Sequence, residues 1–167
     1  MSETKSYSGR CLCGAVSFTA EGVNGEVHAC HCATCRKWSG ASMLAMGTAA
    51  VDFTGASNIA RYDSSEWAQR GFCRNCGSTL FYQLKDQGNY IMCVGAFDDS
   101  PDFELCGEIY IDEKPSGYDF AGEHSRMTGA EFMASIGSGD STSGGWVASR
   151  PPSRLLLSGL RTSWRIR

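Results

Sequence analysis

The sequence CRNCG at residues 73–77 repeats a pattern that occurs earlier in the chain, CLCG at residues 11–14. Each stretch places two thiols on a tight turn that is followed at once by glycine. Glycine adopts a positive φ at little cost, so the chain can curl around a metal ion and turn backbone N–H groups toward the sulfurs. Four thiolates make a closed tetrahedral site, which is a structural type of site. We therefore expect a metal that joins two distant parts of the chain.

The ligands predicted for this site are Cys11, Cys13, Cys73 and Cys76. Four sulfurs suit zinc or iron, and zinc is favoured because nothing else in the sequence indicates electron transfer. The alternative is that these cysteines are only small buried apolar residues. Two pairs that are both followed by glycine disfavour that interpretation.

A third cluster, CHCATC at residues 30–35, offers three thiols and has no obvious fourth cysteine. Three protein ligands, here Cys30, Cys32 and Cys35, are typical of an open zinc site that keeps one position for water or substrate. Closure by His31 or His28 is one alternative, and a metal-free redox CxxC is another. In an extended segment, the ring of His31 would point away from the sulfurs.

The remaining cysteines and the last histidine have no paired spacing. Cys93 and Cys106 lie in or beside apolar stretches and are predicted to pack in the core. His124 lies in a polar stretch that contains glycine, and it is predicted to lie at the surface without a functional role.

Composition sets the broad class of protein. The chain has 167 residues, of which 42% are hydrophobic and 20% are charged, so a single compact domain is expected. A net charge of −3 disfavours a nucleic-acid partner. Nine cysteines, an odd number, and an N-terminus without the apolar run of a signal peptide favour a reducing, cytoplasmic location. No apolar run approaches the roughly 18 residues that cross a bilayer, so no membrane association is expected.

The last part of the chain has a different composition. Residues 137–167 begin with a Gly/Ser-rich stretch and carry five arginines against one aspartate. We expect a zinc-binding domain over residues 1–136 and a disordered linker and basic tail over residues 137–167. The tail is open to three interpretations: a basic arm for an acidic partner, a solvated natural extension, or an artefact of cloning or reading frame.

Within the domain, short apolar runs are interrupted about every ten residues by Gly, Asn or Asp, a pattern typical of strands. The predicted strands are Ala15–Thr19, Glu26–Cys30, Ser42–Gly47, Ile59–Tyr62, Thr79–Leu84, Tyr90–Ala96 and Glu108–Ile111. Two short helices are predicted, at Thr34–Trp38 and Gly129–Ile136. The fold class is therefore all-β, with one or two short helices and sheets joined by zinc.

The ordered motifs of residues 9–125 resemble the glutathione-dependent formaldehyde-activating enzyme family, which also includes centromere protein V. The motifs are CxCG at 11–14, CHCxxCRKxSG at 30–40, YxSS at 62–65, FCxxCGS at 72–78 and GxFDD at 95–99. After residue 105 the chain departs from the family pattern, because it lacks the usual histidine of the late strand and the usual tryptophan after Lys-Pro.

The resemblance implies a β-tent architecture and two zinc ions. One would be structural, on Cys11, Cys13, Cys73 and Cys76, and one would lie at the open site on Cys30, Cys32 and Cys35. It also implies carbon–sulfur lyase chemistry, the reversible joining of glutathione to formaldehyde as S-hydroxymethylglutathione.

The open zinc suits a thiol substrate, because coordination favours the thiolate that attacks a carbonyl. Cys30, Cys32 and Cys35 are therefore the predicted catalytic group, with a glutathione-like thiol and a small aldehyde as partners. Arg36, Lys37 and Ser39 are predicted to meet the carboxylates of the thiol.

Other possibilities remain open from the sequence. Arg61 and Arg70 are weaker candidates for binding the thiol substrate. A non-catalytic zinc-stabilised binding module is the main alternative function, and a redox or metal-buffering protein is the third. A homodimer is possible because small β domains expose sheet edges.

Overall fold

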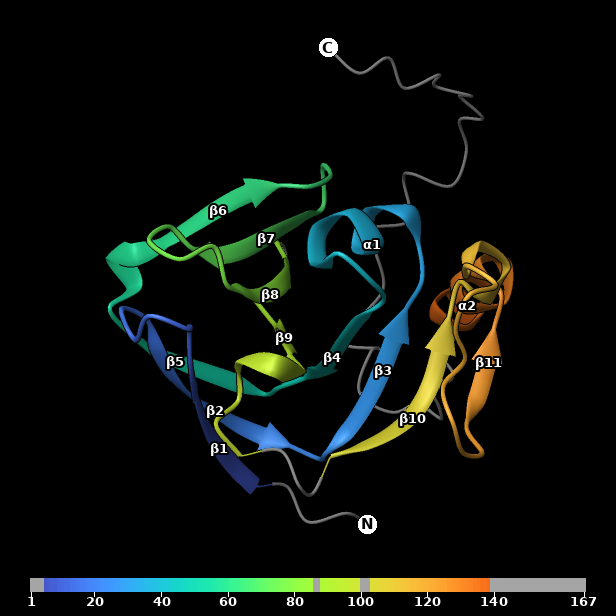
Figure 1. Cartoon of the computed structure of the whole chain (residues 1–167), viewed down its shortest axis with the longest axis horizontal. Helices are drawn as coiled ribbons and strands as arrows, with labels where there is room; N and C mark the ends of the chain where they lie inside the picture. Colours follow the sequence, from blue (N-terminus) through green and yellow to red (C-terminus); the bar gives the residue numbers. More distant parts are fainter. Residues whose placement is uncertain (1–4, 86–87, 100–102, 139–167) are drawn as a thin grey trace.

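A computed structural model describes residues 5–85, 88–99 and 103–138 and shows two β-sheets and two short α-helices (Figure 1). The smaller sheet has three strands in the order β1-β2-β5: β1 (Lys5–Arg10), β2 (Ser17–Val23) and β5 (Ala50–Thr54). The larger sheet has eight strands in the order β11-β10-β3-β4-β9-β8-β7-β6. Its strands are β3 (Glu26–Cys30), β4 (Met43–Gly47), β6 (Ile59–Asp63), β7 (Ala68–Cys73), β8 (Thr79–Leu84), β9 (Tyr90–Cys93), β10 (Glu104–Ile109) and β11 (Ser125–Met127). The helices are α1 (Ala33–Ser39) and α2 (Gly129–Ser138), with single 3₁₀ turns at Ala56–Asn58, Val94–Ala96 and Ile111–Glu113.

The chain crosses between the sheets three times, from β2 to β3, from β4 to β5 and from β5 to β6. Most neighbouring strands are antiparallel, but β10 lies parallel to both β3 and β11. Gly22 has a φ of +68° at the first crossing, and a Cβ there would lie 2.4 Å from the Cβ of Ala49. Only glycine fits this corner, where the first two crossings come together.

Two groups of buried side chains form the core. The larger group lies against both sheets and includes Val16, Phe18, Met46, Phe81 and Phe97. Its aromatic rings meet edge to face, as with Phe18 and Phe97 at 5.2 Å. The smaller group contains sulfur-bearing and aliphatic residues around the start of α1 and also includes one residue of α2, with the members Cys30, Cys35, Met43, Ala45, Ile91, Cys93, Ile109 and Phe132.

The predicted all-β class with two short helices is confirmed. The predicted strands at 26–30 and 79–84 coincide with β3 and β8, and both predicted helices are present as α1 and α2. Four strands were not predicted: β1, β5, β7 and β11. The predicted strand at 108–111 was misplaced, because β10 runs from Glu104 to Ile109 and a 3₁₀ turn follows it.

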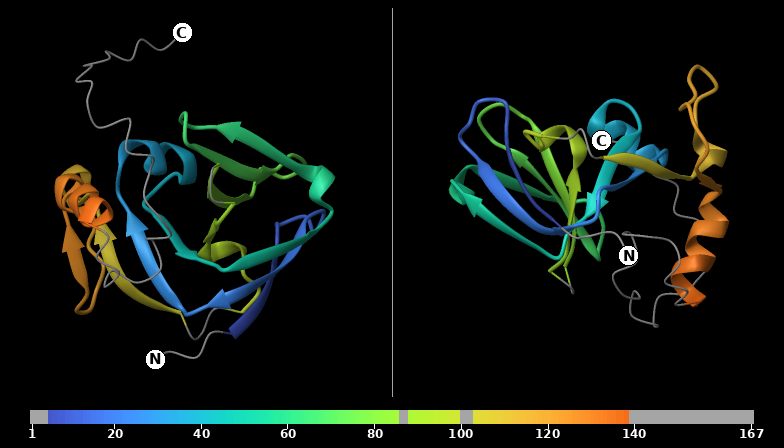
Figure 2. Two further views of the ribbon diagram at one scale, coloured as in Figure 1. Left: turned by 180° about the vertical axis from the view of Figure 1, so that it is seen from behind. Right: turned by 90° about the horizontal axis from the view of Figure 1, so that it is seen from below.

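The C-terminal part of the structure lies at one end of the larger sheet. Figure 2 shows α2 beside the edge that β11 forms. The helix continues to Ser138, while residues 139–167, most of the predicted tail, lie outside the described residues. Within the described residues, no helix is long and apolar enough to span a bilayer.

Candidate metal centres and active site

The first cysteine group joins the two sheets. Cys11 and Cys13 lie between β1 and β2 of the smaller sheet, whereas Cys73 ends β7 of the larger one and Cys76 lies in the turn before β8. The four sulfur atoms all lie within 4.8 Å of one another. The structure thus brings together the four cysteines that the sequence paired by spacing.

The local geometry of this group fits a tetrahedral metal. Sulfurs about 2.3 Å from a zinc ion are spaced about 3.8 Å apart, and the Cys11–Cys13 and Cys13–Cys73 sulfur pairs are separated by 3.6 and 3.8 Å. The amide of Val16 donates to the sulfur of Cys11 at 3.3 Å. Gly14 and Gly77 both have a φ of +76°, as a turn around a metal requires.

The second group, Cys30, Cys32 and Cys35, lies where β3 ends and α1 begins. Its three sulfurs also lie within 4.8 Å of one another, and no fourth Cys, His, Asp or Glu joins them among the described residues. Cys32 caps α1, because its sulfur accepts the amide of Cys35 at 3.4 Å. The cap holds the last two sulfurs on one turn of the chain.

The electrostatics of the three thiols favour a bound cation. Hydrogen bonds with Cys30 and then with Cys35 lower the pKa of Cys32 to about 2. Hydrogen bonds with Cys32 and Cys35, together with burial, raise the pKa of Cys30. The group therefore cannot release all its protons unless a positive charge compensates. A divalent metal would supply that charge, so the residues fit a metal ion here.

His31 does not join the cysteine sulfurs. Its Nε2 donates to Oε2 of Glu108 at 2.8 Å, and its Nδ1 lies 3.1 Å from the hydroxyl of Tyr118. The expectation that this ring points away from the sulfurs is confirmed, because these contacts turn it toward β10 and the following loop. His28, the other predicted closing ligand, is buried on β3 and is not part of the cysteine group.

Glu108 is a site residue that the sequence analysis missed. It is 0% exposed, and each of its two carboxylate oxygens contacts two basic side chains. Oε2 accepts from His31 and lies 3.5 Å from Nζ of Lys114, while Oε1 accepts from His124 at 2.6 Å and from Arg126 at 2.9 Å. This Glu108 cluster ties the loop between two cysteine ligands to the C-terminal part of the domain.

The surface position predicted for His124 is wrong. Its side chain is only 1% exposed, because it turns inward to the carboxylate of Glu108. A polar, glycine-containing sequence gave no indication of a buried acceptor. The one available signal was Glu108 itself, a charged residue within an apolar strand.

Arg70 on β7 also reaches the second cysteine group. Its Nη2 donates to the sulfur of Cys35 at 3.3 Å, and its side chain is buried. Arg61, the other weaker candidate, is exposed, donates to Gln83 at 2.8 Å and lies over the ring of Phe81. The sequence could not rank these two arginines as candidates, whereas the structure places Arg70, and not Arg61, against the sulfur of Cys35.

The three residues predicted to bind substrate lie on α1. Nε of Arg36 donates to the carbonyl oxygen of His31 at 2.8 Å, so part of its guanidinium holds the cysteine loop. Lys37 is exposed. The hydroxyl of Ser39 donates to the carbonyl oxygens of Cys35 and Ala41, both at 2.8 Å.

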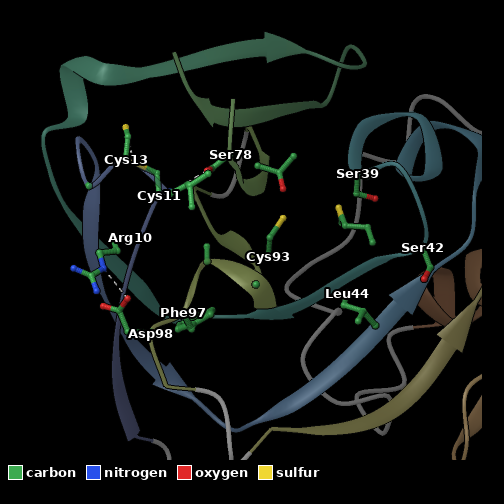
Figure 3. Close-up of a pocket in the computed structure, with 16 residues that line it drawn as sticks. Arg10, Cys11, Cys13, Ser39, Ser42, Leu44, Ser78, Cys93, Phe97 and Asp98 are labelled. Atoms are coloured by element: carbon green, nitrogen blue, oxygen red, sulfur yellow. Dashed lines mark hydrogen bonds and ion pairs between the residues drawn. The ribbon is translucent and has the colours of Figure 1, made fainter. Parts of the chain in front are cut away.

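A cavity of about 820 Å³ lies beside the first cysteine group and extends to the end of α1, and none of Cys30, Cys32 and Cys35 lines it (Figure 3). Cys11 and Cys13 line one side of it, and Ser39 and Ser42 line the side nearest α1. Cys93 lies in its wall, where burial raises the pKa of the thiol to about 11. The volume is in the range of cavities that hold small-molecule ligands.

Known proteins resemble the chain over most of the described domain. Residues 6–113 match the family described as glutathione-dependent formaldehyde-activating enzyme. A Schizosaccharomyces pombe protein named as an uncharacterized lyase is 35% identical over 132 residues, covering 78% of this chain and 96% of the relative. A crystal structure of a Rhodobacter sphaeroides protein is 25% identical, with a TM-score of 0.48, and covers 71% of this chain and 98% of that one. By the extent of the family match and by the yeast relative, the chain belongs to the glutathione-dependent formaldehyde-activating enzyme family.

Proposed function

We propose that this protein is a zinc-dependent carbon–sulfur lyase that acts on a glutathione-type thiol and a small aldehyde. The observation that carries this proposal is the group of three sulfurs, from Cys30, Cys32 and Cys35, which has no fourth protein ligand among the described residues. Three protein ligands leave one coordination position for a substrate atom, whereas the four-cysteine group is closed and structural. Membership of the family and a relative named as a lyase support the same reaction class.

The reaction that fits this site joins a thiol to a carbonyl carbon. The substrate sulfur bonds to the aldehyde carbon and the thiol proton passes to the carbonyl oxygen, giving an S-hydroxymethyl adduct; the reverse reaction breaks that carbon–sulfur bond. Zinc on the three sulfurs would favour the thiolate form of the substrate. The protein positions the two reactants, which is an entropic contribution to catalysis.

The cavity of Figure 3 is our candidate for the peptide part of the thiol substrate. Ser39 and Ser42 line it beside α1, and Ser78 lines it beside the first cysteine group. The basic last turn of α1, with Arg36 and Lys37, offers positive charge for the carboxylates of a glutathione-like molecule.

The test is zinc content together with exchange of label between formaldehyde and its glutathione adduct, followed by ¹³C NMR. We expect two zinc ions per chain and an exchange rate that rises with protein concentration. Cys32→Ser should lose one zinc ion and the added exchange. Cys106→Ser is the matched control, because this cysteine belongs to neither cysteine group and its sulfur donates to the carbonyl oxygen of Glu104 at 3.5 Å. Two bound zinc ions without catalysed exchange would favour a binding module, and one zinc ion would refute the second site.

A further inference from the structure

Arg70 is a buried charge at the edge of the open cysteine group. Its side chain lies on β7 and is 4% exposed. Besides the sulfur of Cys35, its guanidinium contacts the sulfur of Met43, with Nη1 at 3.4 Å. The rings of Tyr82 and Trp38 lie 5.1 and 5.8 Å from its central carbon. Arg70 is thus enclosed by aromatic rings and two sulfur atoms.

None of the acidic residues that the structure describes pairs with Arg70. Its Nε is buried without a hydrogen-bond partner. A buried charge is costly unless an opposite charge compensates it. Of its two sulfur partners, the thioether of Met43 is neutral, so only the sulfur of Cys35 can carry negative charge. Arg70 therefore sets a buried positive charge, without a carboxylate partner among the described residues, directly against the cysteine group.

Three thiolates around a divalent metal carry one net negative charge, which opposes the entry of another anion. We propose that Arg70 is a specificity-determining residue that cancels this charge, so that the open position accepts an anionic sulfur rather than a neutral ligand. This inference rests on the proposed function, because it concerns the fourth ligand of the same site. A neutral ligand gains nothing from the cancelled charge, so the effect of Arg70 is selective.

An arginine suits this place better than a lysine for one physical reason. The planar guanidinium is weakly hydrated and stacks on aromatic faces, whereas an ammonium group is a strongly hydrated point charge. Stacking against Tyr82 and Trp38 therefore stabilises the buried charge without a carboxylate. Arg70→Lys keeps the charge beside Cys35 and loses the stacking, so its cost should fall on stability and not on the preference for the thiol.

The test uses the full chain with cobalt in place of zinc, and it follows the cobalt absorption bands during titration. The anionic probe is 2-mercaptoethanol, which carries charge only on the bound sulfur, and the neutral probe is imidazole. We expect Arg70→Gln to weaken binding of 2-mercaptoethanol by about tenfold or more, because a nearby opposite charge shifts a thiol equilibrium by at least about one pKa unit. Binding of imidazole should change by less than about threefold.

Arg61→Gln is the matched control, because it removes the same charge from the adjacent strand, away from the sulfurs. It should leave both affinities unchanged. Arg70→Lys should keep the preference for the thiol within about threefold of the native protein. Metal content and thermal unfolding are measured for every variant, and Arg70→Met serves as a second charge-removing variant.

The outcomes separate this inference from the proposed function. If the cobalt bands of the native protein respond to neither probe, the site is closed and the proposed function fails. If the native protein responds but Arg70→Gln weakens both probes equally, Arg70 is only structural and the inference is overturned. If neither Arg70→Gln nor Arg70→Met retains cobalt, the result for Arg70→Lys decides. An unchanged preference for the thiol supports the inference. A tenfold loss of that preference in the metal-loaded variant overturns it.

Discussion

A single buried carboxylate, that of Glu108, organises the loop that carries the second cysteine group. Burial alone would raise its pKa, but hydrogen bonds from His124, His31 and Arg126 lower it to about 2. An ordinary glutamate has a pKa of 4.5. Glu108 therefore stabilises the folded protein fully above pH 4.5, and this contribution is lost as the pH falls from 4.5 toward 2.

Replacing Glu108 with Gln should consequently have an effect that depends on pH. At pH 7 we expect the free energy of unfolding to fall by about 3–5 kcal/mol, because the basic partners of Glu108 lose the negative charge that compensates them. The difference from the native protein should shrink as both are acidified through the range from pH 4.5 toward 2. Urea unfolding at a series of pH values measures it. Glu104→Gln, on the exposed start of the same strand, should change stability by less than about 0.5 kcal/mol. A difference for Glu108→Gln that stays constant with pH would contradict the prediction.

At the scale of single residues, local spacing predicted the cysteines because metal ligands are placed by tight turns. The same reasoning could not predict Glu108, and it could not rank Arg70 above Arg61. Their partners come from elements that meet only in the folded protein, as with Arg70 of β7 and Cys35 of α1. No short-range pattern in the sequence marks such a contact.

Two of the strands that were not predicted, β7 and β11, lack the usual sequence pattern of a strand for physical reasons. β7 contains a glycine, Gly71, which ordinarily weakens a strand. Here a Cβ would lie 2.1 Å from the ring of Phe81, so the glycine allows that ring to pack against the strand. The three-residue β11 is held by its parallel pairing with β10 and by Arg126, which donates to Glu108. Tertiary contacts of this kind outweigh strand propensity.

The second helix offers an element-scale prediction, because a reciprocal cap begins it. The amide of Thr128 donates to Oε2 of Glu131 at 2.7 Å, and the amide of Glu131 donates to Oγ1 of Thr128 at 3.2 Å. Thr128→Ala should lower the free energy of unfolding by about 1 kcal/mol. Thr128→Ser keeps the hydroxyl and should retain most of that stability. Urea unfolding and amide exchange of α2 measure the effect, and equal losses in the two variants would show that the cap is unimportant.

Over the whole molecule, the two cysteine groups differ in how much structure they join. The first group connects the β1–β2 turn of one sheet to the β7–β8 turn of the other. The second group lies within the single segment 30–35. Loss of a metal from the first group should therefore separate the sheets, whereas loss from the second should disturb mainly the start of α1.

Treatment with a chelator should show this difference as two phases. We expect one metal to leave while the far-ultraviolet circular dichroism stays close to that of the intact protein. The second should leave together with the loss of the β-sheet signal, because its binding energy is part of the folding energy. A dye that binds released zinc and the dichroism signal are recorded together, with Cys106→Ser as the control. Release of both metals from a chain whose sheets remain intact would contradict this topology.

The Glu108 cluster also has a consequence for biosynthesis. The ribosome makes Cys30–Cys35 long before it makes Glu108, Tyr118 and His124, so the early segment emerges without the groups that hold His31 in place. The four cysteines of the sheet-joining group are all available by Cys76. A nascent chain can therefore assemble the first cysteine group while the thiols of Cys30, Cys32 and Cys35 still lack the contacts that hold their loop. We expect oxidants to damage chains that are still being translated more readily than finished ones.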